Sequence, residues 1–143
     1  SQADQGQRKE LRTARRRPVD DAVLWHALEV AQLDDVVRGL ADGLDTLVGR
    51  DGIRLSGGQR QTVAIARATA FNAKVIIMDE PTSAITQHEV EGLFGIIADL
   101  KRAGVAIAYI THKLEELERI GDDAAIMRDG KMIGFFHNQI QNG

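Results

Sequence analysis

The sequence predicts a layered α/β domain in which helices precede a mainly parallel sheet. Two short apolar runs, 74–79 and 105–110, are rich in β-branched residues and are separated by a stretch of helical periodicity. Such runs are typical of buried parallel strands, and a helix between two of them is the usual crossover connection. The second half therefore alternates strands and helices, which is the order of an α/β domain.

The first half predicts helices. Asp20 can cap a helix with a regular apolar face, formed by Val23, Leu24, Ala27, Leu28 and Ala31. A second short apolar set follows, with Leu33, Val36, Val37 and Leu40. A glycine-rich loop over 41–58 then leads into an alanine-rich helical stretch over 59–71.

Strong start and stop signals bound the helix between the two apolar runs. Thr86 followed by Glu89 is a capping box, and Gly104 is a stop signal. One face of this helix is apolar, with Val90, Leu93, Phe94, Ile97 and Leu100. This face predicts packing against the sheet.

The C-terminal part predicts a short helix and a β-hairpin. Residues 113–121 form a helical pattern that ends at a glycine. The runs 124–127 and 132–137 predict two strands, and Asp129-Gly130 between them is a hairpin turn signal. We therefore expect flanking helices and a C-terminal β-hairpin.

Composition limits the class of protein. The 143 residues are 43% hydrophobic and 27% charged and include no cysteine, which excludes disulfides and thiolate metal sites. No apolar run approaches the roughly 18 residues of a membrane helix. A soluble, intracellular protein is the expectation.

Charge is distributed unevenly along the chain. Residues 1–17 carry six basic and two acidic side chains, although the whole chain has a net charge of −3. A basic arm can contact nucleic acid or anionic lipid, but this one has no aromatic residues that would stack on bases. We interpret it as a solvated terminal segment, and nucleic acid is not an expected partner.

Asp79 and Glu80 are the first candidate site residues. They directly follow a predicted buried strand, where open α/β sheets place ligands. An aspartate there can bind Mg²⁺ against phosphate oxygens, and the next glutamate can polarise an attacking water. The alternative is a strand that ends at a solvated acidic turn.

The stretch Ser56-Gly57-Gly58 is the second candidate. Glycines let backbone N–H groups approach an anion, and the following helix presents its positive end. The alternative is an ordinary flexible loop capped by serine.

His112 is the third candidate, because it follows the second apolar run through Thr111. A histidine at this edge can donate a hydrogen bond to a phosphate oxygen. The alternative, an ordinary surface or packed residue, is the interpretation we give to His26, His88 and His137.

Together these motifs resemble the nucleotide-binding domains of ABC transporter ATPases. "LSGGQ" (55–59) looks like the signature motif of the family, and "VIIMDE" (75–80) looks like its Walker B strand with the catalytic glutamate. "SAIT" (83–86) stands where the family has its D-loop, and His112 stands where it has the switch histidine. The resemblance covers roughly residues 20–136 and implies a partial P-loop NTPase fold.

Two departures accompany the resemblance. Thr86 stands where the D-loop usually ends in aspartate, and no G-x-x-x-x-G-K-[ST] phosphate loop occurs in the 143 residues. The chain therefore resembles the C-terminal part of such a domain. The implied division is a basic arm (1–17), a helical subdomain with the signature loop (18–72) and an α/β core (73–143).

The resemblance also implies ligands and roles. ATP and Mg²⁺ are the expected cofactors. The signature of one cassette would bind the γ-phosphate of ATP held by another, through Leu55, Ser56, Gly57, Gly58 and Gln59. Asp79 would bind Mg²⁺, Glu80 would act as the general base on water, and His112 would steady the γ-phosphate.

The implied partners are a second ATPase cassette, paired head to tail, and transmembrane permease subunits. Such a protein lies in the cytoplasm on the inner face of the membrane. Residues 43–68 look like the exporter branch, whereas residues 74–117 look more like the N-terminal cassette of sugar importers, so import of a sugar-like solute is favoured over export. The alternative is a truncated, non-catalytic cassette that acts as a pairing module.

Overall fold

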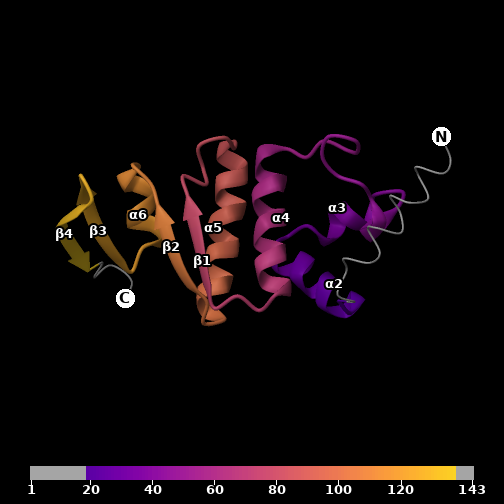
Figure 1. Ribbon diagram of the computed structural model, residues 1–143, viewed down its shortest axis with the longest axis horizontal. Helices are drawn as coiled ribbons and strands as arrows, with labels where there is room; N and C mark the ends of the chain where they lie inside the picture. Colours follow the sequence, from indigo (N-terminus) through magenta and orange to yellow (C-terminus); the bar gives the residue numbers. More distant parts are fainter. Residues whose placement is uncertain (1–18, 138–143) are drawn as a thin grey trace.

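The elements follow one another along the long axis of the molecule, from N-terminal helices to a C-terminal hairpin (Figure 1). The structure is a computed structural model that describes residues 19–137. The basic arm predicted over residues 1–17 lies outside the described residues.

Three helices form the N-terminal layer. They are α2 (Asp21–Val30), α3 (Asp34–Arg38) and α4 (Gly57–Ala70), with a short 3₁₀ turn at Gly43–Asp45. Asp20 caps α2 as predicted, because its side chain accepts a hydrogen bond from the amide of Ala22 (3.0 Å). The core of this layer is made largely of small residues, which allow α2 and α4 to pack closely: Ala27, Ala31, Leu33 and Ala66.

The two apolar runs form a parallel strand pair with a helical crossover. β1 (Val75–Asp79) pairs in register with β2 (Ala106–Ile110), so that Asp79 lies opposite Ile110. The crossover α5 (Gln87–Arg102) has the predicted capping box, and all five of its predicted apolar positions are buried. They pack with Ile76 and Met78 of β1 in the main hydrophobic core.

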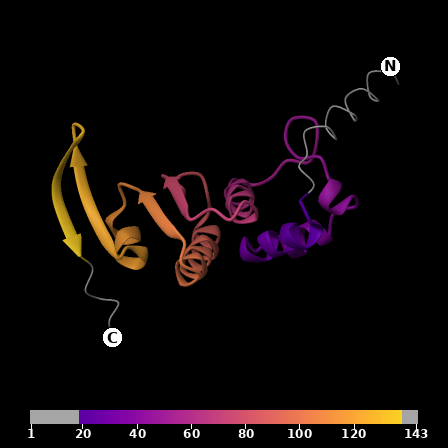
Figure 2. The ribbon, with the colours of Figure 1, turned by 60° about the horizontal axis from the view of Figure 1, so that its bottom comes forward.

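Only one face of this strand pair is covered within the described residues. Figure 2 shows α5 and α6 (Leu114–Ile120) on the same side of β1 and β2. On the opposite face the side chains of Val75, Ile77 and Ile110 are 59%, 71% and 52% exposed. Apolar residues on both faces are typical of strands covered on both sides, and because the sequence holds no phosphate-loop strand and helix to cover them, exposure of part of this surface is expected and is found within residues 19–137.

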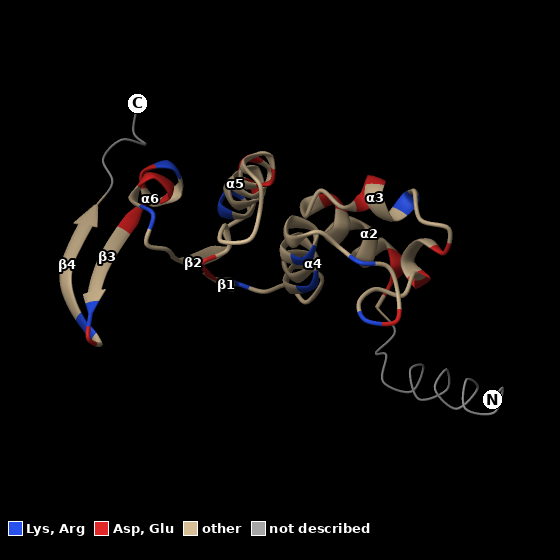
Figure 3. Cartoon of the chain, turned by 90° about the horizontal axis from the view of Figure 1, so that it is seen from above, with Lys and Arg blue, Asp and Glu red and all other residues tan. Residues whose placement is uncertain are grey.

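The chain ends in the predicted hairpin. β3 (Asp123–Arg128) pairs antiparallel with β4 (Lys131–His137), and the turn residues Asp129 and Gly130 both have positive φ, at 50° and 73°. The hairpin is a separate sheet from β1–β2, and its charged residues stand mostly at its ends (Figure 3). Within residues 19–137 no helix has the length and apolarity needed to span a membrane.

Candidate functional site at the ends of strands β1 and β2

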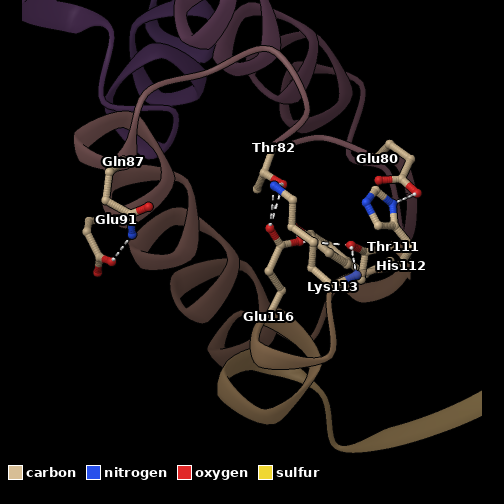
Figure 4. A network of polar contacts seen from close by, with 9 residues as sticks. Glu80, Thr82, Gln87, Glu91, Thr111, His112, Lys113 and Glu116 are labelled. Atoms are coloured by element: carbon tan, nitrogen blue, oxygen red, sulfur yellow. Dashed lines mark hydrogen bonds and ion pairs between the residues drawn. The ribbon is translucent and has the colours of Figure 1, made fainter.

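The carboxyl ends of β1 and β2 bring three predicted site residues to one edge of the sheet. The amide of Glu80 donates to the carbonyl of Ile110 (2.9 Å), which extends the pairing of the two strands by one residue. The side chains of Glu80 and His112 then meet, with 2.8 Å between Oε1 and Nδ1 (Figure 4). Asp79 is exposed directly beside this pair. The sequence had suggested each residue separately, and the parallel register is what brings them together.

The contact between Glu80 and His112 fixes the roles of the imidazole nitrogens. An ionised carboxylate can only accept hydrogen bonds, so Nδ1 of His112 carries the proton that lies between the two groups. In the neutral ring Nε2 is then an acceptor, and it becomes a donor only when the ring is doubly protonated. The imidazole is 76% exposed, so Nε2 is available to a ligand.

Glu80 combines a strained backbone with an unsatisfied side-chain oxygen. Its φ is 45°, a left-handed value that non-glycine residues seldom adopt and that costs on the order of 1–3 kcal/mol. Its second carboxylate oxygen, Oε2, is buried and makes no hydrogen bond within the described residues. Oε2 is therefore a buried acceptor that has no hydrogen-bond donor among residues 19–137.

The signature residues form the start of α4. Ser56 is the N-cap: its hydroxyl accepts from the amide of Gln59 (3.1 Å), and the side chain of Gln59 accepts from the amide of Ser56 (2.9 Å). The carbonyl of Leu55 accepts a hydrogen bond from Arg60 (2.8 Å). These contacts cap the N-terminus of α4. The first backbone amides of a helix have no carbonyl partner within the helix, so this end can bind an anion.

Close packing within the chain requires glycine at position 57, where the obstacle is backbone, and at position 58 a Cβ would displace the side chain of Glu89. A Cβ on Gly57 would lie 2.2 Å from the carbonyl oxygen of Ala84, and a Cβ on Gly58 would lie 2.6 Å from a carboxylate oxygen of Glu89. The predicted D-loop, residues 83–86, thus packs directly against the signature. The sequence suggested glycine for approach to an anion, and the structure adds this second reason.

Glu89 bridges the starts of α4 and α5, and no sequence pattern indicates its contact with Ser56. One carboxylate oxygen accepts from the hydroxyl of Ser56 (2.8 Å), and the other accepts from the amide and the hydroxyl of Thr86 (2.8 and 3.0 Å). The amide of Thr86, followed by the hydroxyl of Ser56, lowers the pKa of Glu89 below its ordinary value. Only the capping box with Thr86 was predictable, because Ser56 is 33 residues distant.

The strand-edge pair and the signature remain separate. None of the hydrogen bonds or ion pairs seen between residues 19 and 137 joins Ser56 to Glu80 or His112. The loop from Glu80 to Thr86 links the two regions and contacts Gly57 through Ala84. The signature and the strand edge are thus free to face two different ligands.

The available ligands suit a magnesium ion that arrives with a nucleotide. Within residues 19–137 no group of three or more histidine, cysteine, aspartate and glutamate side chains could hold a metal. Mg²⁺ is commonly bound by one or two carboxylates together with phosphate oxygens and water. Asp79, an exposed carboxylate at the end of a parallel strand, fits that single-ligand role.

Comparison with known proteins identifies the family. The sequence model described as "ABC transporter" matches residues 3–83, more than half of the chain. The chain belongs to this family. Its fold is that of the nucleotide-binding domain, because it superposes on a structure of a bacterial Atm1-family ABC exporter with ATP bound (TM-score 0.72, 26% identity, 86% of this chain and 21% of that chain).

The similar curated family members include sugar import proteins. The chain is 65% identical over 81 residues to the ribose import ATP-binding protein RbsA of Rhodopirellula baltica. It is 57% identical over 81 residues to the galactose/methyl galactoside import ATP-binding protein MglA of Clostridium tetani. Each match covers 57% of this chain and 16% of the relative, so the matched part spans about one sixth of those proteins.

Proposed function

We propose that this chain forms part of the ATP-binding subunit of an ABC transporter and contributes to coupling ATP hydrolysis to solute transport. The contact between Glu80 and His112, beside Asp79 at the carboxyl edge of β1 and β2, is the observation that carries the proposal. Two further observations support it: membership of the family and the signature helix α4.

The proposed roles follow from the geometry of each group. Glu80 is the general base, since its carboxylate follows the carboxyl end of β1 and is held by His112. His112 orients Glu80 through Nδ1, and in the doubly protonated ring Nε2 would donate to the γ-phosphate. Asp79 is the metal ligand, and a bound Mg²⁺ would neutralise charge on the phosphates.

The signature residues are proposed to act on a different nucleotide. Ser56 and the amides of Gly57 and Gly58, flanked by Leu55 and Gln59, would bind the γ-phosphate of ATP held by a second cassette. Their separation from the strand-edge pair agrees with such a head-to-tail arrangement. In the structure the hydroxyl of Ser56 donates to Glu89, so phosphate binding would have to replace that contact.

Sugar import is the favoured direction of transport. The curated relatives named above are import proteins for ribose and for galactose or methyl galactoside. The neighbour in the solved structures is an exporter, and its likeness supports the cassette fold rather than a direction. We propose permease subunits as further partners, which would place the chain on the cytoplasmic face of a membrane.

We also propose the division of the chain into a helical subdomain over 18–72 and an α/β core over 73–143. The hydrophobic cluster between α2 and α4 supports it, while the main cluster around α5 also includes Ile65 of α4. The loop after α4 is the boundary.

A mixing experiment tests the proposed function. Since the 143 residues hold no phosphate loop, we expect little Mg-ATP binding by this chain alone in titration calorimetry. A second ATP-binding subunit of the family, which has a phosphate loop, is first made inactive by replacing its signature serine. Mixing it with this chain should restore ATP hydrolysis, because this chain supplies the signature in trans. Replacing Ser56 by Ala in this chain should abolish that restoration.

The alternative outcomes are distinct. If this chain binds the added subunit but ATP hydrolysis is not restored, the chain acts as the non-catalytic pairing module. Micromolar ATP binding by the chain alone would contradict the requirement for a phosphate loop from another protein.

A further inference from the structure

A buried carboxylate lies at the centre of a polar network next to the Glu80–His112 pair. Glu116, on α6, is 7% exposed. Its Oε1 accepts from the hydroxyl of Thr82 (2.5 Å), and its Oε2 accepts from the hydroxyls of Tyr109 (2.8 Å) and Thr111 (3.1 Å). The ammonium group of Lys113 lies 3.3 Å from Oε1 and also donates to Thr82 (2.9 Å). Figure 4 shows Thr82, Thr111 and Lys113 around this carboxylate.

The network joins the two segments that carry the proposed catalytic pair. Thr82 stands two residues after Glu80, and Thr111 immediately precedes His112. The hydroxyl of Thr111 also accepts from the amide of Lys113 (3.1 Å), which constrains the chain on the other side of His112. Glu116 therefore connects the loop after β1 with the loop after β2 through its own side chain.

The charge of Glu116 is needed for this arrangement. Burial pushes the pKa of Glu116 upward, but the hydrogen bonds from Thr82, Tyr109 and Thr111 outweigh burial and lower the pKa below its ordinary value. The carboxylate is therefore ionised at neutral pH. An ionised carboxylate offers acceptors only, which matches four surrounding donors, whereas an amide would present two donors of its own to them.

We propose that Glu116 is a positioning residue for Glu80 and His112. The inference rests on the proposed function for its catalytic part. The strained φ of Glu80 persists only where its surroundings fix the backbone. On one side the amide of Glu80 is fixed by Ile110, and on the other side Thr82 is fixed by Glu116. Without Glu116 the second constraint is lost, and the carboxylate of Glu80 is no longer held toward His112.

The variant Glu116→Gln tests the proposal, with Glu115→Gln as the matched control. Glu115 is the preceding residue on the same helix and is exposed. Both variants remove one negative charge from α6 and keep the shape of the side chain. Only the first removes the acceptor at the centre of the network.

A spectroscopic measurement on the 143-residue chain reports the network directly. Tyr109 is the only tyrosine, so the ultraviolet absorbance of tyrosinate follows this residue alone. Burial, followed by the hydrogen bond to Glu116, raises the pKa of Tyr109 above its ordinary value. In Glu116→Gln the titration should shift to lower pH, while Glu115→Gln should titrate as the parent does. Circular dichroism at each pH separates this shift from unfolding.

Amide hydrogen exchange tests the positioning itself. Glu116→Gln should speed exchange at residues 80–83 and 111–113, and Glu115→Gln should leave these amides unchanged. Faster exchange confined to α6 would overturn the proposal, because Glu116 would then serve only its own helix. If Glu116→Gln fails to fold, Thr82→Val removes one hydroxyl with little change of shape and should loosen residues 80–83 alone.

Kinetics complete the test in this chain joined to a phosphate-loop segment of the family, so that ATP lies beside Glu80 and His112. Glu116→Gln should lower kcat by about 10-fold to 10²-fold and leave KM unchanged, because it misplaces the pair without touching nucleotide. An unchanged kcat would overturn the proposal. If even the joined parent chain shows no hydrolysis, the proposed function fails, while the tyrosine titration and the exchange pattern still decide whether Glu116 fixes the two loops.

Discussion

At the scale of single residues, close packing and chemistry make separate demands on the same positions. Gly57 belongs to the signature, yet the carbonyl oxygen of Ala84 lies where its Cβ would be. A methyl group there cannot be accommodated by a rotamer change, because the obstacle is backbone. Packing against residues 83–86 therefore requires glycine at this position, whatever ligand the signature binds.

We predict that Gly57→Ala destabilises the chain by about 1–3 kcal/mol, as overpacked substitutions do, and displaces residues 83–86. Gly95→Ala, within α5, is the control, since a Cβ at Gly95 would meet only a side-chain nitrogen of Gln32, at an ordinary contact distance of 3.7 Å. That change should stabilise the chain by about 0.5–1 kcal/mol through helix propensity. Urea unfolding of both variants measures the difference, and equal effects of the two would refute the packing argument.

Site residues that belong to a motif could be predicted from the sequence. Residues that contact the site from distant parts of the chain were found only in the structure. Asp79, Glu80 and His112 were predictable because each follows a strand. Glu116 and the contact of Glu89 with Ser56 were not, because they depend on residues more than 30 positions away in the chain. A glutamate within a short helix has no local pattern that distinguishes a buried acceptor from a solvated one.

At the scale of elements, α4 and α5 begin at a shared carboxylate. Glu89 caps α5 through Thr86 and reaches the N-cap of α4 through Ser56. Because the pKa of Glu89 is lowered in the folded chain, its contribution to stability is full above the ordinary value of 4.5 and is lost as the pH falls through the lowered folded value. The junction between the two helices should therefore weaken in acid.

We predict a decrease of Tm as the pH falls below about 4.5, and a smaller decrease in Glu89→Gln than in the parent. The reason is that the variant has no carboxylate to protonate at this junction. Glu115→Gln should keep the dependence of the parent. Thermal unfolding between pH 6 and pH 3 followed by circular dichroism is the measurement, and parallel curves for Glu89→Gln and the parent would contradict the prediction.

The elements themselves were largely predictable from periodicity. The apolar face of α5, its capping box and the turn at Asp129-Gly130 are found as predicted. The helices and strands begin and end within one or two residues of their predicted bounds. The exposed face of β1–β2 was expected as well, because the sequence holds no phosphate-loop strand and helix that would cover it. The C-terminal hairpin was expected, and it forms a sheet of its own.

At the scale of the whole molecule, the exposed face of β1–β2, opposite α5 and α6, should determine how stable the chain is and whether it associates. Val75, Ile77 and Ile110 expose apolar surface that would contribute roughly 25 cal/mol per Å² if it were covered. We expect the 143-residue chain to be only marginally stable as a monomer, with Tm below about 65 °C, and to associate as its concentration rises.

We predict that Ile77→Lys reduces this association and leaves the secondary structure intact. Ile77 is 71% exposed, so a charged side chain can reach solvent without entering the core. Ile76→Lys, one residue earlier and facing the core, should instead unfold the chain. Sedimentation velocity over a range of concentrations measures association, and a monomeric parent that melts above about 65 °C would contradict the account.

Glu80 is proposed as the general base of an ATPase site, and two variants measured together decide that role. Turnover and nucleotide affinity should be determined side by side for Glu80→Gln and Asp79→Asn, each in this chain joined to a phosphate-loop segment of the family, so that the ATP lies beside the altered residue. Glu80→Gln should lower turnover by about 10²–10⁴-fold and keep ATP affinity, since it removes the proton acceptor and leaves the phosphate contacts in place. Asp79→Asn should weaken the dependence on Mg²⁺ instead. Turnover of Glu80→Gln at the parent rate would contradict the claim, and Glu80 would then be a strained turn residue without a catalytic role.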